Sequence, residues 1–96
     1  MKLIILSSAV DDLRSGADFY EEQSEGLGSY FLDSLFSDID SLLLYAGVHA
    51  TVFDHYRLLS RRFPYAVYYK IEKDIVIVRR VLDLRRNPER IRESLG

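Results

Sequence analysis

The first half of the chain places apolar residues at helical spacing. A first helix is predicted from Ser8 to the segment SEGLG, because apolar side chains recur every three or four positions, at Val10, Leu13, Ala17 and Tyr20. Ser8 is the expected N-cap, with Asp11 and Asp12 in the first turn. A second apolar stripe predicts a helix over Ser29–Ala46 that ends at Gly47. The short connection predicts that the two helices form an antiparallel hairpin.

Runs rich in Val, Ile, Leu and Tyr predict strands at both ends of this hairpin. They are Lys2–Leu6, His55–Ser60, Tyr65–Glu72 and Ile75–Leu82. Successive side chains of a strand point to opposite faces. The third run therefore has an apolar face and a mixed face, formed respectively by Tyr65, Val67, Tyr69 and Ile71 and by Ala66, Tyr68 and Lys70. Lys73 and Asp74 are the predicted hairpin turn between the last two strands.

A short helix is predicted at the end of the chain. Asn87 is a candidate N-cap, Pro88 suits the first helical position, and Glu89 follows in the first turn. The complete order is β-α-α-β-β-β-α. It predicts an α+β fold in which an antiparallel sheet carries the N-terminal helical hairpin on one face and a short C-terminal helix.

Composition fits one domain over residues 1–96, since 48% of the residues are hydrophobic and none is cysteine. The apolar run that follows Lys2 is too short for a signal peptide or a membrane span, so a soluble cytoplasmic protein without membrane contact is expected. His49 and His55 belong to no recognisable ligand or nucleophile arrangement, and a surface or packing role is favoured for both. No metal site and no cofactor are predicted.

Charge divides the chain into two halves. Residues 1–50 carry two Lys or Arg against nine Asp or Glu, a net charge of −7, whereas residues 51–96 carry eleven against six, a net charge of +5. The formal total of −2 hides this asymmetry. A basic half attracts phosphate or an acidic protein segment, and the acidic helices are expected to be a solvated surface.

The order of elements and three short motifs resemble the RelE/ParE superfamily, the toxins of type II toxin–antitoxin systems. The motifs are RRFPYAVYY at residues 61–69, IVIVRRVL at 75–82 and RRNP at 85–88. Tyr20, Gly28 and Phe31 also match the aromatic, glycine and Phe positions of the helical hairpin in such proteins. The resemblance covers essentially the whole chain and implies a prokaryotic cytoplasmic toxin that its cognate antitoxin neutralises by direct binding, in a hetero-oligomer.

The resemblance leaves two cellular targets open, because the superfamily divides by function. RelE-like members cleave mRNA on the ribosome, whereas ParE-like members act on DNA gyrase without chemistry of their own. This chain has Ala66 where nucleases often carry Arg, Asp83 where they often carry His, and no His or Tyr after Leu84. Arginine alone binds phosphate and transfers no proton. The ParE-like reading is therefore favoured, with an mRNA endoribonuclease and a degenerate, non-toxic partner-binding domain as alternatives.

Binding candidates follow from the cations and aromatic residues of the second half. Consecutive strand residues point to opposite faces, so Arg79 and Arg80 are expected on different faces, one exposed and the other paired with an acid. Tyr68 is the candidate for base stacking, because it shares its face with Lys70. The candidates for binding a target or an antitoxin are Arg57, Arg61, Arg62, Tyr68, Arg79, Arg80, Arg85 and Arg86. A groove for an antitoxin helix is predicted at Tyr20, Leu27 and Phe31.

Overall fold

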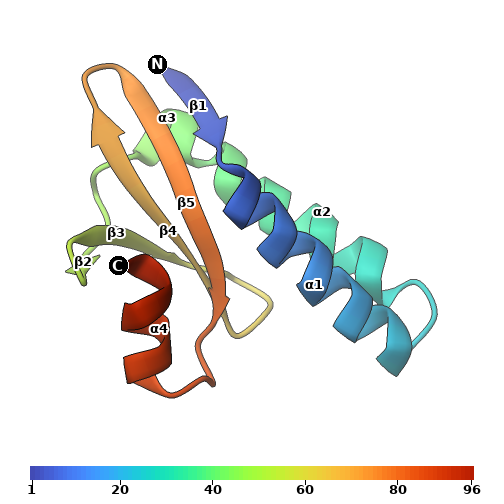
Figure 1. Ribbon diagram of the computed structural model, residues 1–96. Helices are drawn as coiled ribbons and strands as arrows, with labels where there is room; N and C mark the ends of the chain where they lie inside the picture. Colours follow the sequence, from blue (N-terminus) through green and yellow to red (C-terminus); the bar gives the residue numbers. More distant parts are fainter.

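The computed structural model describes all 96 residues, Met1–Gly96, and confirms the α+β fold (Figure 1). The elements are β1 (Lys2–Ile5), α1 (Ser7–Gln23), α2 (Leu27–Asp40), α3 (Leu42–Tyr45), β2 (Thr51–Val52), β3 (His55–Leu59), β4 (Tyr65–Glu72), β5 (Ile75–Asp83) and α4 (Pro88–Leu95). The strands form one sheet in the order β1-β5-β4-β3-β2. None of the helices combines the length and apolar content needed to cross a membrane.

The sheet is mixed, whereas the sequence predicted an antiparallel one. β5, β4, β3 and β2 pair antiparallel through short turns, but β1 pairs parallel with β5, with Lys2 opposite Ile75 and Ile5 opposite Val78. A parallel pair requires a long crossover connection. Here that connection runs through the helical hairpin and the rest of the sheet. The two-residue β2 was also not predicted, because Thr51–Val52 is too short to give a periodic signal.

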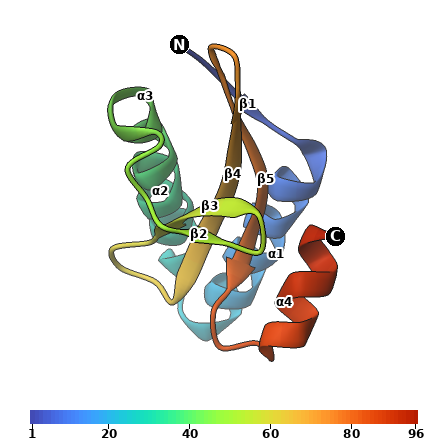
Figure 2. The same cartoon turned by 90° about the vertical axis from the view of Figure 1, so that its left-hand side faces the viewer.

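The helical hairpin covers one face of the sheet, as predicted, and encloses the main core. α1 and α2 run side by side next to β5 and β4 (Figures 1 and 2). Their buried residues meet the apolar face of β4, including Val67 and Tyr69, at 0% exposure. The helices approach closely at two glycines. A Cβ on Gly16 would lie 2.5 Å from the Phe31 ring, and a Cβ on Gly28 would lie 2.6 Å from the Ala17 carbonyl oxygen.

The start of α1 differs from the prediction. The helix begins one residue earlier, with Leu6 at the N-cap position and no side-chain cap, so Ser8 is not the cap. The Ser8 hydroxyl instead donates to the Arg79 carbonyl oxygen at 2.8 Å. Asp11 and Asp12 therefore lie beyond the first turn, and Asp12 makes contacts with β5 that are described below.

The predicted helix over residues 29–46 is divided. α2 ends at Asp40, and the single turn of α3 follows after Ser41, whose hydroxyl donates to the Asp38 carbonyl oxygen at 2.6 Å. A hydroxyl that competes for a helix carbonyl favours a bend or an end there. Gly47 then takes a left-handed φ of 96°, which ends the helical segment as expected.

α4 packs on the other face of the sheet from the hairpin (Figure 2). Its cap was predicted correctly, since the Asn87 side chain accepts a hydrogen bond from the Glu89 N–H at 2.8 Å and Pro88 is the first helical residue. A second, smaller core lies beneath it, formed by Ala66, Tyr68, Leu82, Ile91 and Leu95. The mixed face of the sheet is therefore partly covered.

Candidate functional site

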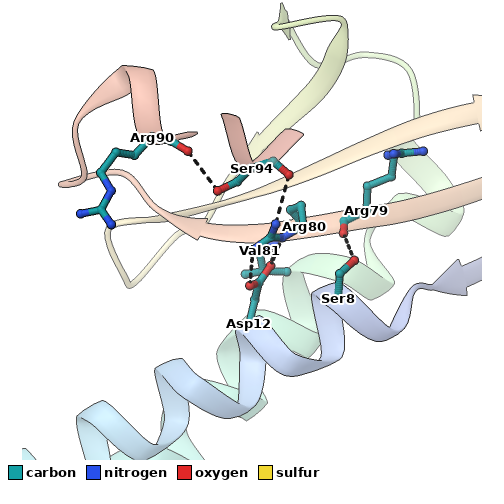
Figure 3. A network of polar contacts seen from close by, with 7 residues as sticks. All are labelled: Ser8, Asp12, Arg79, Arg80, Val81, Arg90 and Ser94. Atoms are coloured by element: carbon teal, nitrogen blue, oxygen red, sulfur yellow. Dashed lines mark hydrogen bonds and ion pairs between the residues drawn. The ribbon is translucent and has the colours of Figure 1, made fainter. Parts of the chain in front are cut away.

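A cluster of cationic and aromatic side chains lies on the sheet face that α4 covers. We call it the α4-face cluster and define it as His55, Arg57, Tyr68, Lys70 and Arg79. Strand alternation places His55 and Arg57 on one face of β3, and Arg57 lies opposite Tyr68 in the β3–β4 ladder. Figure 3 shows the Arg79 side chain on the opposite side of β5 from α1. Three adjacent strands thus bring the cluster together.

His55 is buried, with 4% of its surface exposed, whereas the three cations of the cluster are half-buried. Its Nδ1 lies 2.7 Å from the Phe53 carbonyl oxygen. Because a carbonyl only accepts, Nδ1 carries the proton and Nε2 holds a lone pair, yet Nε2 is buried without a partner. Burial lowers the pKa of His55, and the charges of Lys70 and Arg79 lower it further, which keeps the ring neutral near pH 7.

A cleft of about 320 Å³ opens beside His55, between the β2–β3 turn and α4. Its lining residues are Phe53, Asp54, His55, Lys70, Arg92, Leu95 and Gly96. Among its charged lining residues, Arg92 is paired with Glu89, whereas Lys70 and Asp54 make no ion pair. Lys70 and His55 were not predicted as site residues from the sequence. Their alternation with Tyr68 and Arg57 was the signal that could have found them.

The stacking role predicted for Tyr68 is wrong in this conformation. Tyr68 shares the face of Lys70 as expected, but α4 covers it and leaves 1% of its surface exposed. Burial raises the pKa of its phenol, and the neighbouring Arg57 guanidinium partly offsets that shift. A base therefore cannot stack on Tyr68 while α4 is in place.

Arg80 has a structural role, and it is the member of the Arg79–Arg80 pair that binds an acid, as was predicted for one of the two. A β-bulge lies at this point, since Tyr68 pairs with Arg80 but Tyr69 pairs with Val78. The extra residue, Arg79, shifts the alternation of β5, so that Arg80 has the parity of Leu82 in the second core. The Arg80 guanidinium reaches around the edge of β5 to Asp12, with Nε–Oδ2 at 2.7 Å and Nη2–Oδ1 at 2.9 Å (Figure 3).

The arginines after β5 differ in their contacts. Arg85 forms a two-pronged ion pair with Asp83, with Nη2–Oδ2 at 2.8 Å and Nε–Oδ1 at 3.0 Å. This contact lowers the pKa of Asp83 and raises that of Arg85. The Asp83 carboxylate, which would repel phosphate if it were unpaired, is thus neutralised locally. Arg86 is exposed and makes no ion pair, so it is the more available cation of the two.

The cations at the β3–β4 connection are Arg61 and Arg62, and both are exposed. Arg62 donates to the Tyr30 hydroxyl at 3.1 Å and lies over the Tyr30 ring at 5.6 Å from its centre. Arg61 makes no hydrogen bond or ion pair and lines a polar pocket against α2. Both remain accessible binding candidates.

The predicted groove at the helical hairpin is largely filled by aromatic rings. Phe31 has 0% exposure and contacts the rings of Tyr20, Phe63 and Tyr65 at 5.2, 5.0 and 4.9 Å between centres. Phe31 is therefore a core residue and cannot contact an antitoxin directly. Tyr20 and Leu27 are half-buried and remain candidates at the surface.

No group of three or more His, Cys, Asp or Glu side chains is arranged to hold a metal ion. The chemistry that the α4-face cluster offers is anion binding by arginine and lysine, together with one neutral imidazole whose lone pair is covered. These groups are insufficient for phosphate transfer in the present conformation, because a substrate cannot reach the His55 imidazole, the one candidate base.

Comparison with known proteins identifies the fold. No protein-family model matches the chain, and no curated protein matches it significantly. A chain of the solved structure described as "Chromosomal ParDE TA system from P. aeruginosa" superposes with a TM-score of 0.77 and 18% sequence identity. The match covers 88% of this chain and 96% of that chain. The fold is RelE/ParE-like, as the sequence motifs indicated.

Proposed function

We propose that this chain is the toxin of a type II toxin–antitoxin pair and is inhibited by direct binding of an antitoxin polypeptide. The observation that supports the proposal is the match to a chain of a chromosomal ParDE toxin–antitoxin system over nearly the full length of both chains. The motifs at residues 61–69, 75–82 and 85–88 support it independently, because they are a property of the residues and not of the backbone geometry.

Within this class, a ParE-like action on DNA gyrase is favoured over catalysis. Arg80 and Arg85 are held by Asp12 and Asp83, so neither is free to stabilise a phosphate. The C-terminal segment beyond Leu84 contains no His or Tyr that could transfer a proton. A toxin that acts by binding needs an exposed complementary surface rather than a proton-transfer pair, and Arg61 and Arg86 provide exposed cations for one.

One observation supports the alternative of an mRNA endoribonuclease. The α4-face cluster combines three cations with a tyrosine and a histidine whose Nε2 has no partner. A neutral imidazole is a suitable base for a ribose hydroxyl. This alternative requires α4 to move, since α4 covers Tyr68 and the Nε2 atom of His55 is buried. It therefore ranks second, and a non-toxic domain that only binds its partner ranks third.

The test begins with growth on induction. Expression of the chain alone is expected to abolish colony formation, and co-expression of the small protein encoded beside it is expected to restore growth and to co-purify as a complex. The purified chain should inhibit supercoiling by gyrase and produce no cuts in primer extension on translating ribosomes. Cuts within A-site codons would place the endoribonuclease first. Normal growth with folded protein present would leave the partner-binding domain.

Arg86→Glu is the informative variant. It reverses the charge of an exposed arginine that makes no ion pair, so its effect on stability should be within about 0.5 kcal/mol. Growth inhibition should be lost, because attraction for an acidic or phosphate partner becomes repulsion. Arg14→Glu on α1 is the matched control, as it makes the same charge change at a side chain that is 70% exposed. Equal toxicity of the two variants would remove Arg86 from the site.

A further inference from the structure

A second polar pocket lies away from α4, between the outer side of α2 and the β3–β4 connection. It has a volume of about 310 Å³. Its lining residues are Tyr30, Asp33, Ser34, Ser37, Asp38, Arg61 and Arg62. Only Tyr30 is an apolar lining residue, which distinguishes the pocket from the mostly apolar sites that bind drug-like molecules. The polar lining indicates a charged or strongly hydrogen-bonding occupant.

Asp38 is a buried carboxylate without a counter-ion. It is 6% exposed, and its side chain accepts one protein hydrogen bond, from the Ser60 hydroxyl to Oδ2 at 2.8 Å. A carboxylate can accept about four hydrogen bonds. Buried carboxylates are normally paired with a cation, because burial without one is costly. Asp38 forms no ion pair within the chain and therefore retains unused acceptor capacity.

Ser34 provides a second, independent sign of an incomplete site. It lies one helical turn before Asp38, lines the same pocket and is 8% exposed. Its hydroxyl oxygen is buried and has no hydrogen-bond partner. Buried polar groups are satisfied in the great majority of cases, so an unpartnered hydroxyl beside an unpaired carboxylate indicates a missing ligand group.

The cations of the pocket do not fill this role. Arg62 is held at Tyr30 by a hydrogen bond and by contact with the ring. Neither Arg61 nor Arg62 forms an ion pair with Asp38 or Asp33, although both arginines line the pocket. The pocket thus offers carboxylate acceptors at Asp38 and Asp33 and guanidinium donors at its rim. This polarity suits a basic side chain flanked by peptide carbonyls.

We infer that this pocket binds the guanidinium or ammonium group of a basic side chain, with Asp38 as the charge partner and Arg61 as a donor to flanking carbonyl groups. The shared chemistry is a cation on a flexible aliphatic stem, carried either by a polypeptide or by a free diamine or amino acid. The pocket is separate from the α4-face cluster but shares Arg61 with the exposed cations of the proposed toxin surface. Its test measures ligand binding to the isolated chain, so its outcome is distinguishable from that of the growth assay.

The experiment is an NMR titration of the ¹⁵N-labelled full chain with N-acetyl-L-arginine amide, which represents an arginine within a polypeptide. Saturable shifts are expected at the amides of Ser34, Asp38 and Arg61. N-acetyl-L-citrulline amide is the matched ligand control, because its urea group has nearly the same shape without the charge. Agmatine separates the two sources: stronger binding of the arginine amide indicates a polypeptide, and stronger binding of agmatine indicates a free cation.

Asp38→Asn tests the charge partner. Loss of one charged hydrogen-bonding partner should weaken binding about 10- to 100-fold. Asp40→Asn is the control at an exposed position outside the pocket and should bind as the parent chain does. The melting temperature supplies a second readout. If Asp38 serves a ligand, removing its unpaired charge should leave the free protein as stable or more stable. Unchanged binding by Asp38→Asn, or equal binding of the citrulline compound, would overturn the inference.

Discussion

The contact between Asp12 and β5 gives the sharpest stability prediction for this fold. β1 pairs with β5 only as far as Val78, and beyond that point the edge of β5 has no strand beside it. Side chains of α1 instead form hydrogen bonds with the backbone of this edge. Ser8 donates to the Arg79 carbonyl oxygen, and Asp12 Oδ2 accepts from the Val81 N–H at 2.9 Å (Figure 3). Asp12 therefore satisfies both a strand edge and the Arg80 guanidinium.

The cost of Asp12→Asn can be estimated from this geometry. An exposed ion pair contributes about 0–1 kcal/mol, whereas breaking a buried pair costs about 3–5 kcal/mol. The side chains of Asp12 and Arg80 are 13% and 25% exposed, so their pair lies between these limits. The asparagine retains one acceptor for Val81 but presents an amide donor to the guanidinium. We expect a loss of about 2–3 kcal/mol, or roughly 8–24 °C in melting temperature.

The assay is urea unfolding followed by circular dichroism, with Asp11→Asn as the control. Asp11 is the adjacent residue, is 74% exposed and lies 3.8 Å from Arg14, so its substitution should cost under about 0.5 kcal/mol. A double-mutant cycle with Arg80→Met should show coupling, because each change removes the same pair. If Asp12→Asn and Asp11→Asn unfold at the same urea concentration, the reasoning about the β5 edge is refuted.

Two further predictions concern helix packing and pH. Gly28→Ala should destabilise the chain by about 1–3 kcal/mol in urea unfolding, because the new Cβ would lie 2.6 Å from the Ala17 carbonyl oxygen, whereas an alanine at exposed Ser29 should be nearly neutral. Burial lowers the pKa of His49 and His55 below 6.5, so the unfolded chain binds more protons than the folded chain as the pH falls. Their contribution to stability is complete above about pH 6.5 and decreases below it, and an unfolding free energy that stays constant between pH 7.5 and 5.5 would contradict this.

Local patterns predicted the elements of this fold well because each depends on neighbouring residues. The bounds of Tyr65–Glu72 agree with β4, and the Lys73–Asp74 turn joins β4 to β5 with Lys73 at a φ of 55°. The alternation in β4 also identified which residues face the helical hairpin, since Val67 and Tyr69 belong to the main core. Periodicity reports which side of a strand is apolar, and here that side was the one that the hairpin covers.

The position of α4 on the sheet could not be predicted from the sequence, because periodicity does not show which element covers the mixed face. Ala66 and Tyr68 share a strand face with Lys70, a pattern typical of a half-exposed surface. The chain that follows Asp83 brings Ile91 and Leu95 of α4 over them. The consequence was an incorrect role for Tyr68. The candidate site could not be predicted either, because the sequence does not show that Lys70 and Arg79 lie close to His55.

Arg79 and Arg80, at the β5 bulge, are adjacent and chemically identical but have different contacts. An unpaired bulge residue has no partner across the ladder, so Arg79 is placed by the bulge rather than by the strand alternation that the sequence suggests. Arg79 makes no ion pair and its charge acts on His55, whereas Arg80 has an acid on α1 and the Ser94 carbonyl oxygen on α4 as partners. The second contact links α4 to the same guanidinium that completes the β5 edge. Arg80 therefore couples the helical hairpin to the helix that covers the α4-face cluster, while the charge of Arg79 stays unpaired within the chain. Backbone geometry thus divides these two adjacent arginines into one that maintains the fold and one whose charge is not used in an ion pair.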